Sequence, residues 1–122
     1  MTDEERCIQS GIDAAVALCH SRSVHAGWWD GPAPRNPGEM IALIHSEISE
    51  ALEGIRKDSF DDHLPDRKMV EVELADTLIR IFDMAGGLNL DVAGALIEKL
   101  EYNRTREDHK REARAAAGGK AF

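Results

Sequence analysis

The sequence predicts an all-α protein, and three observations support this prediction. Apolar residues recur at helical spacing in four segments, no segment alternates with the two-residue period of a half-buried strand, and polar or glycine- and proline-containing stretches separate the segments. Four helices with short connections favour an antiparallel four-helix bundle. At 122 residues the chain fits one domain, expected over residues 1–106 and followed by a charged extension over residues 107–122.

The first predicted helix covers residues 4–21 and is amphipathic. The segment that follows, residues 25–38, is rich in glycine and proline, which disfavour both helix and central strand. We therefore expect a long ordered loop here, which carries the adjacent Trp28 and Trp29 and can cover a site. The apolar stripe of the helix consists of Ile8, Ile12, Ala15, Val16, Leu18 and Cys19.

Three further helices are predicted from periodicity and end signals. The second starts at residue 38 or 39 and runs to about residue 57, where basic residues suit a C-terminus. The third runs from about residue 67 to residue 85 and is expected to stop at Gly86-Gly87. Asp91 is the predicted N-cap of the fourth helix.

Charge and composition narrow the classes of partner. The chain has 23 acidic residues against 15 Lys and Arg, a formal net charge of −8. A duplex-DNA or anionic-membrane binder needs a basic face, so we expect neither a nucleic-acid polymer nor a membrane as partner. The charged N-terminus and the lack of a long apolar run predict a cytoplasmic protein, in the host cytoplasm if the gene is viral.

Two acidic doublets on successive predicted helices are the main functional signal. They are Glu47-x-x-Glu50 and Glu73-x-x-Asp76. A spacing of i, i+3 puts both members of a doublet on one side of a helix, so two packed helices can direct four acids into one cleft. Such carboxylates repel one another unless a hard cation neutralises them. The sequence therefore predicts all four as Mg²⁺ or Mn²⁺ ligands in a phosphate enzyme.

The positions of these acids on their helices support a buried role. Glu47 falls inside the apolar arc of its helix, so its carboxylate should be partly desolvated or paired. The third helix is apolar around most of its circumference, which is typical of a buried helix. Its narrow polar strip, expected to face the open side or to line a polar cleft, consists of Glu73, Asp76, Arg80 and Asp83.

A basic edge on the fourth helix complements the acids. Lys99, Asn103 and Arg106 follow i, i+4, i+7 spacing and lie on one side of the helix. Arg and Lys side chains there can bind phosphate oxygens and stabilise the charge that develops during phosphoryl transfer. The alternative is that they pair with the carboxylates as structural salt bridges.

Together these residues resemble the MazG-like family of all-α nucleoside triphosphate pyrophosphohydrolases, relatives of dimeric dUTPases and of all-α dCTP pyrophosphatases. The family signature is ExxE, a spacer and ExxD, which the two doublets match with residues 51–72 between them. The segment Lys99-x-x-x-Asn103-Arg104-x-Arg106 looks like the family's downstream KxxxNRxR segment. The resemblance spans about residues 28–106.

The resemblance implies a reaction and a set of roles. The reaction is hydrolysis of a (d)NTP at the α-phosphorus to (d)NMP and pyrophosphate, with Mg²⁺, or Mn²⁺ as a substitute, held by the four acids. Glu47 or Glu50 is implied to orient or deprotonate the attacking water. The residues implied to engage the phosphates or to lie near the substrate are Lys99, Asn103, Arg106 and Tyr102.

The resemblance also bears on base recognition and assembly. Family members bind the base with aromatic residues, for which Trp28 and Trp29 are the candidates here. Family members also assemble as dimers or tetramers, in which a neighbouring subunit often contributes residues to the site. For this chain we therefore expect a homodimer or homotetramer. Some small viral members of the family act on purine nucleotides such as dGTP. The sequence itself does not specify which base or which sugar the substrate of this chain carries.

Two other classes of function use helical carboxylates of this kind. A ferritin-like di-iron bundle also uses helical carboxylates, but it typically needs Glu-x-x-His on two helices, and this sequence contains no Glu-x-x-His. A non-enzymatic helical interaction or regulatory protein, whose acids and cations form only a salt-bridge network, stays open.

Overall fold

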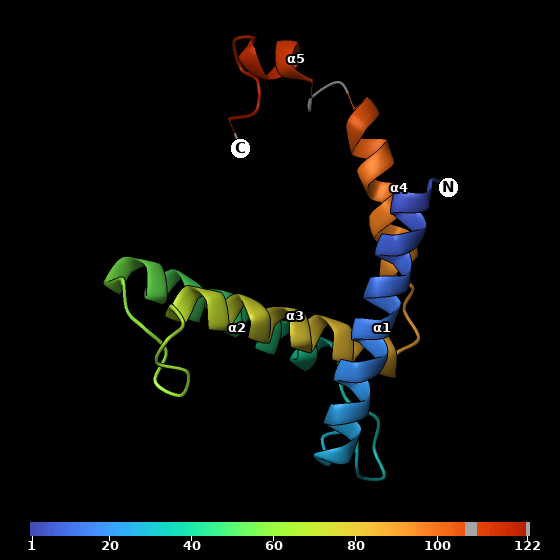
Figure 1. Ribbon diagram of the computed structural model, residues 1–122, viewed down its shortest axis with the longest axis vertical. Helices are drawn as coiled ribbons and strands as arrows, with labels where there is room; N and C mark the ends of the chain where they lie inside the picture. The colour runs from blue at the N-terminus through green and yellow to red at the C-terminus, as the bar shows by residue number, and fades with distance from the viewer. Residues whose placement is uncertain (107–109, 122) are drawn as a thin grey trace. The chain divides into compact units, whose positions relative to one another are not determined.

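The structure of the protein is a computed structural model that describes residues 1–106 and 110–121 (Figure 1). Its helices are α1 (Asp3–His25), α2 (Pro37–Lys57), α3 (Met69–Gly87), α4 (Val92–Thr105) and α5 (Arg111–Ala115). Within these ranges the only strand-like pairing is an isolated antiparallel bridge between Phe60 and Lys68. The all-α class is confirmed, whereas the four-helix bundle stays a prediction. No described helix is both long and apolar enough to cross a bilayer.

The chain divides into two compact units, each described here by itself. One unit is Ala14–Leu90, which contains the second half of α1, the following loop, α2 and α3. The other combines Met1–Asp13 with Asp91–Phe122. The single domain over residues 1–106 and the extension over 107–122 stay predictions. Within that extension, α5 is described, and residues 107–109 and 122 lie outside the described residues.

The N-terminal ends of α2 and α4 follow their capping signals. The Asn36 side chain accepts hydrogen bonds from the first two amides beyond Pro37, at 2.8 and 3.3 Å. The Asp91 side chain accepts one from the Gly94 amide at 2.9 Å. These bonds satisfy N–H groups that have no partner inside the helix. The predicted Asp91 cap is confirmed, and α2 begins slightly early because proline suits the first helical position.

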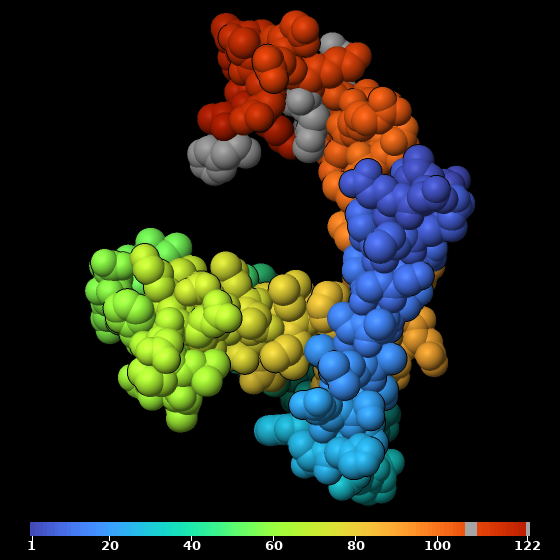
Figure 2. All heavy atoms as spheres, in the orientation of Figure 1, coloured from blue at the N-terminus to red at the C-terminus, as the bar shows by residue number. Residues whose placement is uncertain are grey.

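Helices α2 and α3 form an antiparallel pair in the Ala14–Leu90 unit. Gly54 near the end of α2 faces the start of α3, where a Cβ on Gly54 would come within 3.0 Å of Met69 Cγ. Buried Met40, Ala51 and Ala85 belong to the same pair. In the space-filling view, the atoms of α3 and of the connection from α2 form a continuous surface (Figure 2). This close, antiparallel register brings the middle of α2 opposite the middle of α3.

The glycine pair at the end of α3 differs from the sequence prediction. Helix α3 does not stop before these residues but runs through them to Gly87, with Leu88 as its C-cap. A Cβ on Gly86 would lie 2.6 Å from His20 Cβ, and one on Gly87 would lie 2.0 Å from Trp29 Cη2. The glycines are therefore required because two aromatic rings pack against the last turn of the helix.

Candidate metal centre

Three of the four predicted acidic ligands meet between α2 and α3. Glu47 on α2 and both Glu73 and Asp76 on α3 each offer a carboxylate oxygen, and these oxygens all lie within 4.8 Å of one another. We call these three residues the acidic cluster. All three are half-buried, and the spacing is short enough for one small divalent cation to contact several of the oxygens.

Glu50, the fourth predicted ligand, lies one helical turn beyond Glu47 and is exposed. It is not part of the group whose oxygens lie within 4.8 Å. Its charge nevertheless acts on the cluster, because it helps to raise the pKa of Glu73. The structure thus brings three acids together and leaves Glu50, an exposed residue, outside this group.

Burial and the proximity of like charges raise the pKa of two of these carboxyl groups, Glu73 and Asp76. Burial, followed by a hydrogen bond to Glu47 and repulsion from Glu47, Asp76 and Glu50, raises the pKa of Glu73 from 4.5 to about 7. Burial and the Glu47 charge also raise the pKa of Asp76, although Arg80 opposes this effect. Near neutral pH the cluster therefore holds a proton readily, and a cation at the same place would relieve the same repulsion.

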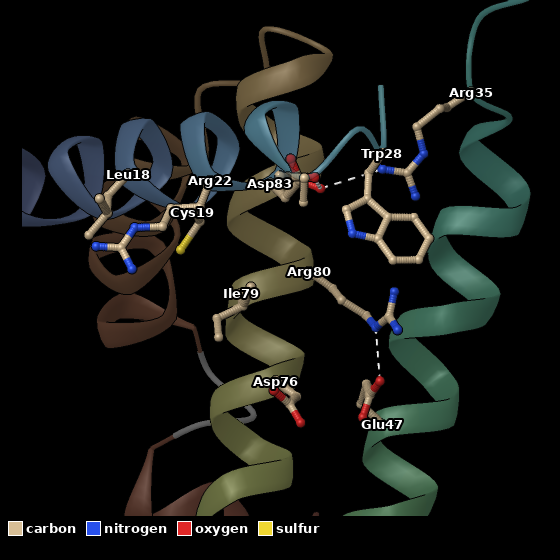
Figure 3. Close-up of a pocket in the computed structure, with 12 residues that line it drawn as sticks. Leu18, Cys19, Arg22, Trp28, Arg35, Glu47, Asp76, Ile79, Arg80 and Asp83 are labelled. Atoms are coloured by element: carbon tan, nitrogen blue, oxygen red, sulfur yellow. Dashed lines mark hydrogen bonds and ion pairs between the residues drawn. The ribbon is translucent and has the colours of Figure 1, made fainter. Parts of the chain in front are cut away.

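Arg80 partly neutralises the acidic cluster. Its Nε donates a hydrogen bond to Glu47 Oε1 at 2.9 Å, and the Glu47 side chain is 16% exposed (Figure 3). The expectation that Glu47 is either desolvated or paired is thus met on both counts. Arg80 itself is 38% exposed, so the ion pair is partly screened and can exchange partners.

A cavity of about 640 Å³ adjoins the acidic cluster. Glu47 and Asp76 line one part of it, and Trp28 and Arg35 from the loop after α1 line another, with Arg80 drawn between them (Figure 3). Its volume lies in the range of pockets that hold small molecules. Arg22, near the end of α1, also lines the cavity.

The two adjacent tryptophans have different surroundings. Trp28 is 66% exposed and lines the cavity, so its indole is accessible to a bound molecule. Trp29 is half-buried and is not among the cavity-lining residues. It packs edge-on against His20, with ring centroids 5.0 Å apart. Of the two candidates for base contact, Trp28 lines the cavity and Trp29 does not, and base contact itself stays a prediction.

Asp83 on α3, which also lines the cavity, organises the loop and the end of α1. Asp83 is a buried carboxylate with an exposed fraction of 8%. Its Oδ1 accepts from Trp29 Nε1 at 2.8 Å and lies 3.0 Å from His20 Nδ1. Its Oδ2 accepts from Ser23 Oγ at 2.7 Å and from Arg35 at 3.4 Å. We call these five residues the Asp83 cluster.

The predicted phosphate-binding residues lie on and just after α4, in the other unit. Lys99 Nζ lies 4.6 Å and the Arg106 Cζ atom 5.7 Å from the centre of the Tyr102 ring, so the two cations lie near the same ring. The neighbouring Asn103 is half-buried, and its Oδ1 atom has no hydrogen-bond partner among the described residues. That these residues meet the acids at one site stays a prediction.

Sequence reasoning missed the two pairings that shape the site. It placed Arg80 and Asp83 on the polar strip of α3, but it identified neither Arg80 as the partner of Glu47 nor Asp83 as an anchor for the loop. The available signal was a carboxylate on a helix that is apolar nearly all round, since such a group must find donors when it is buried. Its partners are far away in the sequence, so spacing could not reveal them.

No family model, curated protein or solved structure matches this chain. The assignment of a function therefore rests on the residues and on the geometry described above.

Proposed function

We propose that the protein is a Mg²⁺-dependent nucleotide pyrophosphohydrolase that converts a (d)NTP to (d)NMP and pyrophosphate. The observation that supports this function best is the acidic cluster, Glu47, Glu73 and Asp76, placed at one end of a cavity that also presents arginines and an accessible indole. Acids, cations and an aromatic ring are the groups that recognise a metal, phosphates and a base. The MazG-like resemblance supplies the reaction.

The donor set suits the proposed cation. Carboxylate oxygens are hard ligands, as Mg²⁺ and Mn²⁺ require, and no nitrogen or sulfur atom of a described residue belongs to the group. Glu47, Glu73 and Asp76 would hold the ion, with Glu50 as the predicted fourth ligand. When bound, Mg²⁺ lowers the pKa of a coordinated water and offsets charge on the phosphates.

The chain's own residues would then direct the substitution at phosphorus. Water attacks the α-phosphorus as the bond to the bridging oxygen breaks, and pyrophosphate leaves. A carboxylate takes the proton that the water loses. Between the two candidates, Glu50 is the better placed, because a Glu47 oxygen already accepts from Arg80. Lys99, Asn103, Arg106 and Tyr102 retain their predicted roles at the phosphates, and Trp28 retains its role at the base.

The test is a screen for pyrophosphate release from the common NTPs and dNTPs, with Mg²⁺, with Mn²⁺ and with EDTA. We expect divalent-ion-dependent release from at least one nucleotide, with a purine nucleotide such as dGTP among those tested first. Equal amounts of (d)NMP and pyrophosphate would locate the attack at the α-phosphorus. Release of inorganic phosphate in place of pyrophosphate would overturn the proposed reaction.

A non-enzymatic helical interaction protein is the second candidate, and the Glu47–Arg80 ion pair favours it, because that pair neutralises part of the acidic cluster without any metal. Calorimetric titration with Mg²⁺ separates the two. Binding at the cluster supports the hydrolase. No binding, together with no turnover of any nucleotide, supports the interaction protein.

A further inference from the structure

The loop between α1 and α2 is held at both ends by neighbouring helices. At its start, the Ala26 and Trp28 amides donate to Arg22 and Ser23 carbonyl oxygens at 3.0 and 3.2 Å. At its end, Asn36 caps α2. Between these points the loop contains Gly27 and Gly31 with φ of +89° and +114°, a conformation that side-chain-bearing residues rarely adopt. Because glycine is conformationally permissive, a further attachment inside the loop would stabilise this one conformation.

The Asp83 cluster provides this attachment. Two residues within the loop reach the same carboxylate: Trp29 bonds to one oxygen and Arg35 to the other. Arg35 also lies over the Trp29 ring, 4.8 Å from its centre, so the two loop residues support each other. Because Asp83 is buried, losing its acceptor oxygens would leave these donors without partners in a poorly hydrated place.

The loop residues held in this way form part of the cavity wall. Trp28 precedes Trp29 directly, and Arg35 contacts both Asp83 and the cavity (Figure 3). Two residues of the acidic cluster, Glu73 and Asp76, are on the same helix as Asp83, but no residue of the acidic cluster makes any of the hydrogen bonds of the Asp83 cluster. A change at Asp83 should therefore disturb the arginine and indole part of the cavity and leave the carboxylates in place.

We propose that Asp83 is a positioning residue that fixes Trp28 and Arg35 in the cavity wall and so sets the affinity for the nucleotide, without taking part in the chemical step. This inference rests on the proposed function for its kinetic consequence. The anchoring of the loop by Asp83 is independent of that function and is measured separately.

The principal variant is Asp83→Asn. An amide has one acceptor oxygen, so it can serve either the Trp29 and His20 side or the Ser23 and Arg35 side, but not both, and it has no charge for Arg35. We expect KM to rise about tenfold with kcat changed by less than about threefold. A variant that only loses folded protein would instead show a lower apparent kcat at an unchanged KM. The kinetic parameters therefore distinguish a displaced loop from a smaller folded fraction.

A second measurement follows the loop directly. The chain has two tryptophans, so Trp28→Phe leaves Trp29 as the only indole fluorophore. In that background we expect Asp83→Asn to shift Trp29 emission to longer wavelength and to increase its quenching by iodide. The matched control is Asp58→Asn, at a side chain 89% exposed beyond the end of α2, which should change neither quenching nor KM.

A third variant guards against misfolding of the first. Trp29→Phe keeps an aromatic ring and leaves Asp83 intact but removes the Nε1–H donor, and it too should raise KM more than it lowers kcat. Unchanged iodide quenching of Trp29 in Asp83→Asn would overturn the anchoring. Greater quenching at an unchanged KM would overturn the link to the nucleotide. If the wild-type protein turns over no nucleotide, the proposed function fails, and the quenching comparison still decides whether Asp83 anchors the loop.

Discussion

At the scale of single residues, like charges at short distance dominate the acidic cluster. Burial and the nearby carboxylates, Glu47 among them, raise the pKa of Glu73 and of Asp76, and the only described cation in hydrogen-bond contact with the cluster is Arg80. A metal ion, a proton and an arginine are therefore alternative ways to neutralise the same carboxylates.

Removal of individual acids tests their assignment as ligands. We expect Glu50→Gln and Asp76→Asn each to abolish turnover, because an amide binds a hard cation more weakly than a carboxylate and cannot accept the proton of the attacking water. Far-ultraviolet circular dichroism should show that both variants keep their helical content. Activity near the wild-type level in both would exclude these residues from the metal site.

The raised pKa of Glu73 predicts how stability depends on pH. The pKa of Glu73 is about 7 in the folded chain and near its ordinary value of 4.5 in the unfolded chain. Between pH 4.5 and pH 7 the folded state therefore binds more protons than the unfolded state. Without metal, the free energy of unfolding should therefore fall as pH rises from about 4.5 to about 7. Thermal unfolding in EDTA measures this, and Glu73→Gln, which mimics the protonated acid, should show a weaker decline.

Mg²⁺ supplies the complementary observation for Glu73. Since metal binding requires the carboxylate form, the rise in Tm on adding Mg²⁺ should be larger at pH 8 than at pH 5. An equal rise in Tm at both pH values would contradict a site that contains this residue.

Arg80 competes with a cation for Glu47. Replacing Arg80 with Gln removes a positive charge 2.9 Å from a Glu47 oxygen, so the cluster becomes more negative and should bind Mg²⁺ more tightly. A partly exposed ion pair contributes about 1 kcal/mol, which corresponds to roughly a fivefold lower Kd for Mg²⁺. Isothermal titration calorimetry measures the Kd, with Arg56→Gln on the exposed face of α2 as control. Weaker Mg²⁺ binding by Arg80→Gln would refute the competition.

At the scale of elements, the close contacts at the end of α3 decide the position of the loop after α1. Gly87 faces the Trp29 ring at a distance that leaves no room for a side chain. Gly11 on α1 is the contrasting case, because a Cβ there would meet nothing within 4 Å. The same substitution should therefore have opposite effects at the two positions.

Gly87→Ala should lower the free energy of unfolding by about 1–3 kcal/mol, since the added methyl must displace Trp29. Gly11→Ala should raise it by about 0.5–1 kcal/mol, because alanine favours the helix and no contact opposes it. Urea unfolding followed by circular dichroism measures both. A Gly87→Ala protein as stable as the wild type would show that the packing of Trp29 against α3 is not tight.

At the scale of the whole molecule, the described residues bury few hydrophobic side chains. The buried ones are Met40, Ala51, Ala85 and Ala93, while Leu52 and Ile55 on α2 are 57% and 63% exposed. Two packed helices with so small an interior gain limited stability by themselves. Assembly of further copies of this chain, as expected from the MazG-like resemblance, would cover such side chains.

The expected assembly is a homodimer or homotetramer. Light scattering coupled to size-exclusion chromatography should give two or four times the mass of one chain, and Leu52→Lys should shift it toward the monomer, because a charge would be placed in an apolar interface. Glu53→Lys, at the neighbouring position on the same helix, is the control for a general effect of added charge. A wild-type protein that elutes as a monomer at all concentrations would contradict the assembly.

The sequence by itself determined the helical class, the approximate helix bounds and the Asp91 cap, because these follow from apolar periodicity and from local hydrogen bonding. It also identified the acids that lie between α2 and α3, since a carboxylate inside an apolar arc stands out from its own helix. Only the tertiary structure showed that Glu50 lies outside the acidic cluster. It alone also showed that Arg80 pairs with Glu47 and that Asp83 accepts a hydrogen bond from Trp29. These partners are 33 and 54 positions apart in the chain, so their contacts depend on how helices and loop pack and not on the spacing within any one segment.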